Sequence, residues 1–150
     1  MEKYDREMAR RVWQRVQGEP PREQPGQNLL AMLQGELMAA SAYLMLSRQM
    51  SGRAAQVLQR MYREEQNHAA YLKGMYLLAA GQMPALRAPQ PVKEPLETAL
   101  RKCYGAELKS ASEYEGCSAD PEFGHVFAQM ARQEREHCAC VLELIGSLQK

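Results

Sequence analysis

The segments REEQNHAAYL (residues 63–72) and RQEREHCACV (residues 132–141) each place a glutamate three residues before a histidine. Residues three apart on an α-helix project from the same face, so each glutamate and its histidine can hold one metal ion between them. The surrounding sequence is rich in Leu, Met and Ala, which favour helix. The ligand candidates of the two segments are the pairs Glu65 with His68 and Glu134 with His137.

Both segments belong to an internal repeat. The repeat joins two pairs of similar segments in the same order: GELMAASAY (35–43) with AELKSASEY (106–114), and MYREEQNH (61–68) with MARQEREH (130–137). The first pair aligns Glu36 with Glu107, which adds one glutamate on a further predicted helix in each half. Glu64 and Glu136 could compete as ligands, but the second pair aligns Glu64 with Gln133 and Glu136 with Asn67. The glutamate three residues before the histidine is therefore the stronger ligand candidate in both halves.

Pro and Gly divide the chain into five predicted helices and two predicted units. Residues 1–27 comprise a short amphipathic docking helix (1–17) and a Pro-rich linker, and residues 28–150 are expected to form a bundle of four long helices. The long helices are expected at residues 29–50, 53–80, 95–117 and from Pro121 onward. Asp120 is the expected N-cap of the last one, because a helix favours Asp at that position and Pro directly after it.

Each predicted hairpin brings two carboxylates to one height. Residues on antiparallel helices face each other when they lie equally far from the turn between them. The midpoint of Glu36 and Glu65 falls at the break SG, and the midpoint of Glu107 and Glu134 falls at the dipeptide DP. Each pair therefore lies about 20 Å from its turn, at about 1.5 Å per residue.

The Pro-rich connection at residues 81–95 predicts a long crossover between the hairpins. It can span about 43 Å at about 3.1 Å per residue, whereas a simple antiparallel neighbour needs only a short loop. The helices would then run up, down, down and up, and all four glutamates and both histidines would meet near mid-bundle. Burying four carboxylates without cations is very unfavourable, so two divalent ions are expected there. Carboxylates mixed with imidazoles suit iron or manganese.

The four long predicted helices carry, in order, a Glu, an ExxH motif, a Glu and an ExxH motif. This pattern resembles that of the ferritin-like di-iron carboxylate superfamily. Within it the compact hairpins are most similar to the rubrerythrin group, and the resemblance covers residues 28–148. The resemblance implies a ferritin-like four-helix bundle that binds two iron ions, with manganese or a mixed pair of metals as alternatives. It also implies that the protein reduces hydrogen peroxide or activates dioxygen. The ligands that it implies are Glu36, Glu65, His68, Glu107, Glu134 and His137.

The sequence departs from the rubrerythrin pattern in two places. That group carries a further carboxylate one turn from the ligand on the third helix, where this chain has Cys103, Tyr104, Ser110 and Ala111 around Glu107. It also often carries a rubredoxin-like domain with paired CxxC motifs, whereas this sequence has only CAC near its end. Electrons are therefore expected from a separate donor.

Four tyrosines are candidates to donate a hydrogen bond or an electron to the centre, with ordinary packing as the alternative. Tyr62 and Tyr104 each lie three residues before a predicted ligand and are the preferred pair. Tyr43 and Tyr114 lie two turns beyond a predicted ligand. Groups that orient a ligand often matter nearly as much as the ligand itself.

Composition excludes several other classes of function. Nineteen Lys and Arg against eighteen Asp and Glu give a formal net charge of +1, which predicts no nucleic-acid or anionic membrane partner. No unbroken apolar run of about 18 residues and no secretory signal are found, so a cytoplasmic protein without a membrane span is expected. The four cysteines are interpreted as reduced thiols, and a homo-oligomer, in the first instance a dimer, is expected.

Three other functions are compatible with this sequence. One is iron handling, in which ferrous ions are bound, oxidised as by a ferroxidase, and passed on or stored. Another is hydroxylation of a small apolar substrate, which needs an apolar channel. The third is a purely structural helical bundle without metal.

Overall fold

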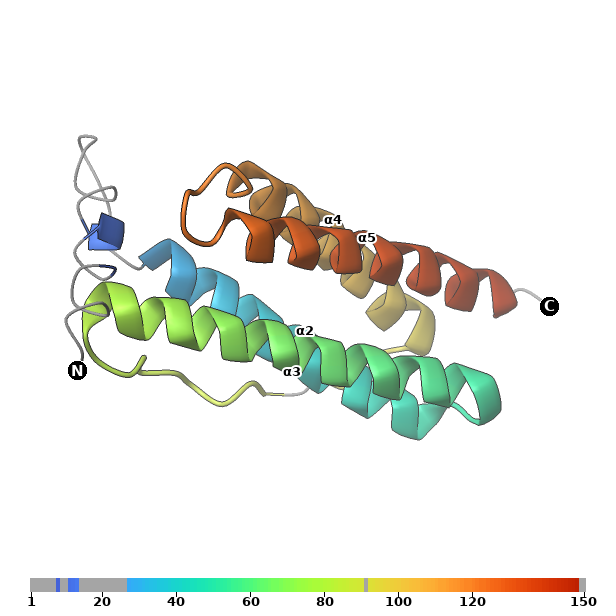
Figure 1. Cartoon of the computed structure of the whole chain (residues 1–150). Helices are drawn as coiled ribbons and strands as arrows, with labels where there is room; N and C mark the ends of the chain where they lie inside the picture. Colours follow the sequence, from blue (N-terminus) through green and yellow to red (C-terminus); the bar gives the residue numbers. More distant parts are fainter. Residues whose placement is uncertain (1–7, 9–10, 14–26, 91, 149–150) are drawn as a thin grey trace.

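The computed structural model describes Met8 and residues 11–13, 27–90 and 92–148, and its regular structure in these ranges is entirely α-helical (Figure 1). This confirms the predicted all-α class. Met8 and residues 11–13 are helical and Val12 is buried, while the rest of the predicted docking helix and its linker lie outside the described residues.

The four long helices are α2 (Gln27–Gln49), α3 (Gly52–Ala80), α4 (Leu96–Gly116) and α5 (Gly124–Ser147). The first three agree with their predicted boundaries to within two residues. They are amphipathic segments whose buried positions recur every three or four residues, as in the α3 series Leu58, Met61, Glu65, His68 and Leu72.

The fourth helix begins later than predicted. The Asp120 carboxylate accepts hydrogen bonds from the backbone N–H groups of Glu122 (2.8 Å) and Phe123 (2.9 Å), as an N-cap does. However, residues 121–123 form a separate turn, and α5 starts at Gly124. A Cβ atom at Gly124 would lie 2.3 Å from the Ser118 carbonyl oxygen, so this close approach of the backbone requires glycine.

The helices form two antiparallel hairpins, α2 with α3 and α4 with α5, joined by a long crossover (Figure 1). Gly81 ends α3 in the left-handed conformation (φ 74°), and its N–H bonds to the Leu77 carbonyl. The crossover then runs back along the bundle, so α4 starts at the end where α3 started. Contacts between α2 and α4 and between α3 and α5 join the hairpins, which leaves the other two pairs diagonal.

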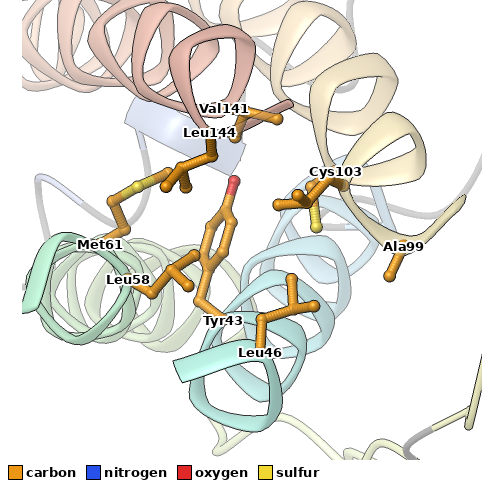
Figure 2. Close-up of a cluster of buried hydrophobic side chains, with 9 residues drawn as sticks. Tyr43, Leu46, Leu58, Met61, Ala99, Cys103, Val141 and Leu144 are labelled. Carbon is orange, nitrogen blue, oxygen red and sulfur yellow. The ribbon is translucent and has the colours of Figure 1, made fainter. Parts of the chain in front are cut away.

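Two apolar clusters fill the bundle. The Leu58 cluster contains the buried residues Tyr43, Leu46, Leu58, Met61, Ala99, Leu100, Cys103, Val141 and Leu144. Figure 2 shows that its side chains converge from all four helices. The Phe127 cluster contains Leu33, Ala69, Leu72, Met75, Tyr114, Phe127, Met130 and Ala131. In each of the four helices, buried glutamate or histidine lies between the positions of these two clusters.

One described segment, Asn28–Gln49 of α2, is long and apolar enough by composition to cross a membrane, with a mean hydropathy of 1.5. This segment is not an unbroken apolar run, because Gln34 and Glu36 interrupt it. Its length and mean hydropathy nevertheless meet the criteria for a membrane span, which was not predicted from the sequence. The core helices of soluble proteins also meet these criteria of length and hydropathy. Here α2 packs against α3 and α4 and buries Glu36 among them.

Candidate metal centre

The structure brings all six predicted ligands together in the interior. They come from all four helices and are each at most 2% exposed: Glu36 from α2, Glu65 and His68 from α3, Glu107 from α4, and Glu134 and His137 from α5. The equal distances of each glutamate pair from its turn place the four carboxylates at one height, and the crossover puts the two hairpins in register. Six ionisable groups therefore share one buried layer.

These side chains form two groups, each with ligand atoms within 4.8 Å of one another. The His68 site consists of Glu36, Glu65, His68 and Glu134, and the His137 site consists of Glu65, Glu107, Glu134 and His137. Glu65 and Glu134 belong to both groups. Each site thus has one histidine and one glutamate of its own and shares two carboxylates with the other.

Each histidine directs its Nδ1 atom toward a carboxylate of the other hairpin. Nδ1 of His68 lies 2.7 Å from Oε1 of Glu134, and Nδ1 of His137 lies 2.7 Å from Oε1 of Glu65. The two rings are stacked with centroids 6.2 Å apart. The two halves of the internal repeat are therefore related by an approximate twofold arrangement about the centre.

Many polar atoms of this layer make no hydrogen bond, although other polar atoms of the layer lie close to them. They are Glu36 Oε2, both carboxylate oxygens of Glu65, His68 Nδ1, Glu107 Oε2, Glu134 Oε1 and His137 Nδ1. Leaving buried polar atoms unpaired is unfavourable, and native structures contain few of them. Nitrogen and oxygen atoms from imidazoles and carboxylates are the ligands of divalent transition metals. The residues present therefore fit a pair of divalent ions, which would balance the four carboxylates.

The outward-facing nitrogen of each histidine donates to a residue of the other hairpin. Nε2 of His68 lies 2.6 Å from Oε1 of Gln133, and Nε2 of His137 lies 2.6 Å from Oε2 of Glu64. A proton on Nε2 leaves the lone pair of Nδ1 free for a metal ion, so these contacts select the ligating tautomer. Sequence reasoning considered Glu64 only as a weaker ligand candidate. The alignment of Glu64 with Gln133 showed only that this position is polar in both halves of the repeat, and not which histidine it contacts.

Two tyrosines from the opposite hairpin orient the unshared glutamates. The hydroxyl of Tyr43 donates to Oε1 of Glu107 at 2.7 Å, and the hydroxyl of Tyr114 donates to Oε1 of Glu36. Both rings also lie edge-on to a histidine, Tyr43 to His137 and Tyr114 to His68. The unshared ligands are therefore held by the opposite hairpin.

These tyrosine contacts differ from the preferred prediction, which assigned them to Tyr62 and Tyr104. The hydroxyl of Tyr62 instead accepts a hydrogen bond from Gln66, and Tyr104 packs half-buried against the Leu58 cluster. Tyr43 and Tyr114 lie two turns beyond a glutamate, so they share its buried face. Helical side chains lean toward the N-terminus of their helix, which brings these hydroxyls back toward the carboxylate layer.

Burial and mutual contact shift the pKa values of the centre strongly. Burial raises the pKa of Glu36 and raises that of Glu134 to about 11. Burial alone would lower the pKa of His137, but contacts with Glu107 and Glu65 raise it to about 11. His68 behaves in the same way through Glu134, Glu36 and Glu65. Without metal, bound protons take the place of cations in this layer.

Glu65 is the exception among these groups. Burial opposes its ionisation, but contacts with Glu36, His137 and His68 hold its pKa below the ordinary value. The pKa values of the two shared carboxylates, Glu65 and Glu134, are therefore shifted in opposite directions in the absence of metal. Binding of metal cations to these carboxylates and imidazoles would release the protons that the layer holds without metal.

All four cysteines are free thiols in the structure, in agreement with the prediction. Cys103 lies one turn before Glu107 within the Leu58 cluster, and burial, together with the nearby Glu107 charge, raises its pKa to about 12. A buried thiol with a raised pKa is a poor nucleophile. Cys103 therefore acts as a packing residue.

No family model, curated protein or solved structure matches this chain. The case for a metal centre therefore depends on the residues themselves. The spacing of the repeat selects six side chains from the sequence, and the structure gathers the same six into two groups that could each hold a metal ion.

Proposed function

We propose that this protein is a ferritin-like four-helix bundle of rubrerythrin-like type that binds two iron ions and reduces hydrogen peroxide or activates dioxygen. The observation that carries the proposal is the sharing of Glu65 and Glu134 by two otherwise separate ligand groups. Glu65 and Glu134 would help to hold both ions, and a pair of ions so held would supply chemistry at both oxygens of an O–O bond.

The ligand types are compatible with iron, which is the metal we propose. All six are carboxylates or imidazoles, and none is a thiolate, so the donor set suits iron or manganese, including a mixed pair. When bound, a pair of reduced iron ions supplies electrons and Lewis acidity to the O–O bond. We propose a separate electron donor for repeated turnover, and a cytoplasmic homo-oligomer as the working form of the protein.

The chain's own residues hold and shield this chemistry. Tyr43 and Tyr114 fix one oxygen of each unshared glutamate, which leaves the other oxygen available to an ion. Gln133 and Glu64 fix the two imidazole rings by accepting from Nε2. The Leu58 and Phe127 clusters keep water from the two ends of the polar layer. Electrostatic interactions with the ligands are strong in such a dry environment.

Rapid mixing with peroxide tests the proposed activity. Protein loaded anaerobically with two Fe²⁺ per chain is expected to be oxidised by hydrogen peroxide roughly tenfold faster or more than free Fe²⁺, because the ions are held together in place. Stopped-flow absorbance measures the rate. Oxidation no faster than that of free Fe²⁺ would contradict the proposal. Uptake of iron well beyond two ions per chain would favour iron handling instead.

A cavity beside the centre favours a second candidate, oxidation of a small apolar substrate. It has a volume of about 490 Å³ and lies between α2, the crossover and α4. Its lining includes Gly35, Met38, Ala42, Cys103 and the ligand Glu107. This volume is in the range of small-molecule sites, which are mostly apolar with a few polar groups. A molecule bound there would lie next to the His137 site.

Filling the cavity tests this second candidate. No atom lies within 4 Å of a Cβ placed at Gly35, so Gly35→Leu adds its side chain to the cavity without a clash at Cβ. We expect it to weaken binding of the neutral fluorophore N-phenyl-1-naphthylamine by about tenfold, since one displaced group contributes about 1–2 kcal/mol. Metal content should not change.

Gly74→Leu on α3 is the matched control, because it is the same exchange at a helical glycine with equally open surroundings outside the cavity lining. Both exchanges raise helix propensity by a similar amount. Equal fluorophore binding by the two variants would show that the cavity is not the binding site.

A further inference from the structure

The two histidines of the centre make the same outward contact with chemically different partners. His137 donates to the carboxylate of Glu64 and His68 donates to the amide oxygen of Gln133, each at 2.6 Å. Glu64 and Gln133 occupy equivalent positions of the internal repeat. The two halves of the repeat therefore differ in the charge of the residue at this position.

The remaining contacts of the two sites correspond closely. Each site has one unshared glutamate that accepts from a tyrosine, one histidine, and the same two shared carboxylates. All of the ligating side chains are buried. The partner of the histidine is therefore the clearest chemical difference between the sites.

A carboxylate supports a ligating imidazole more strongly than an amide does. Both oxygens orient the ring, but a hydrogen bond to a carboxylate is roughly twice as strong as one between neutral groups. A carboxylate partner also raises the basicity of the imidazole, and loss of such a partner typically costs about 10–100-fold in metal affinity. Its negative charge attracts the ion in addition.

Arg60 offsets the charge of Glu64 only in part. Its Nε lies 3.6 Å from Oε1 of Glu64, and its side chain is 52% exposed, so water screens this ion pair. Arg60 also donates to the Sγ of Cys140. The Oε2 atom of Glu64, which faces His137, is left to the imidazole.

We infer that the two metal sites are unequal, and that the His137 site binds its ion more tightly than the His68 site because Glu64 supports His137 where Gln133 supports His68. The inference rests on the metal-binding part of the proposed function. A chain with one ion bound holds it at the His137 site, and the His68 site is the one from which an ion is exchanged.

Titration with Co²⁺ alone tests the difference in affinity. In the full chain, calorimetry is expected to resolve two steps separated by about tenfold or more. Glu64→Gln should weaken the tighter step by about tenfold and bring the steps together. Gln133→Glu should instead tighten the weaker step. Both exchanges preserve side-chain size, so the fold is expected to remain.

Anomalous diffraction from crystals with one Co²⁺ per chain locates the first ion. We expect it at the His137 site in the unaltered protein and at the His68 site in the double variant Glu64→Gln/Gln133→Glu. Equal occupancy in the unaltered protein, or an unchanged order in the double variant, would overturn the inference while leaving the proposed function intact. Failure to bind any Co²⁺ would overturn both.

Discussion

Glu134→Gln is expected to abolish metal binding at both sites, whereas Glu36→Gln should abolish it at one. Glu134 supplies a ligand atom to both groups, and Glu36 supplies one only to the His68 site. Replacing a carboxylate by an amide removes a negative charge and an anionic ligand. The loss of affinity should exceed the roughly 100-fold upper range seen for residues that only support a ligand. Elemental analysis after gel filtration should find no ion per chain for the first variant and one for the second.

The Glu134→Gln variant is expected to fold without metal. Burial raises the pKa of Glu134 to about 11, so the metal-free protein holds this group neutral near pH 7, and glutamine has the same shape as the protonated acid. A loss of metal from this variant would therefore report on ligation and not on unfolding.

Glu136→Gln is the matched control for the same helix. Glu136 lies two residues from Glu134 on α5 but is exposed and belongs to neither ligand group. It should retain two ions per chain. Retention of two ions by Glu134→Gln would contradict the shared-carboxylate centre, and the bundle would then be better explained as purely structural.

The metal-free protein is expected to lose stability as the pH rises from about 5 to about 9. The folded-state pKa values of Glu134 and His137 are each about 11, above their ordinary values of 4.5 and 6.5. Above pH 4.5 Glu134 holds its proton in the folded state but loses it in the unfolded state, and the same is true of His137 above pH 6.5. Because the folded state then binds more protons than the unfolded state, the free energy of unfolding falls as the pH rises. The raised pKa values of Glu36 and His68 act in the same direction.

Glu65 does not cancel this trend. Its folded-state pKa is lowered, so its contribution is fully present above the ordinary value near 4.5 and is lost only as the pH falls below it. Each additional proton held by the folded state lowers the free energy of unfolding by about 1.4 kcal/mol for each unit by which the pH rises. In a chain of this length that corresponds to roughly 3–5 °C in Tm per pH unit.

Calorimetric melting in the presence of a chelator, at intervals between pH 5 and pH 9, measures this dependence. Bound Co²⁺ should reverse it or remove it, because metal ions replace the protons and bind more tightly as proton competition falls. Glu134→Gln should lose the part of the slope that belongs to Glu134. A Tm that rises steadily from pH 5 to pH 9 in the metal-free protein would contradict the assignment of bound protons to this layer.

The six side chains of the centre could be identified from spacing alone. A separation of three residues puts Glu65 and His68 on one helix face, and equal distances from a turn put Glu36 opposite Glu65. Both relations are one-dimensional, since they depend only on the helical repeat and on positions along the chain. The length and Pro content of residues 81–95 likewise indicated the crossover. The start of α5 was placed too early because the close approach of Gly124 to Ser118 is a tertiary contact.

The partners of these six side chains depended on the packed structure. The spacing of residues does not predict that Tyr43 donates to Glu107 while Tyr62 bonds to Gln66 instead. Nor does it predict that Glu64 accepts from His137 on a neighbouring helix and not from His68 on its own helix. Such contacts depend on the rotation of each helix about its axis and on the separation between helices. Those quantities follow from how all the side chains of the core fill space together, which no local pattern in the chain encodes.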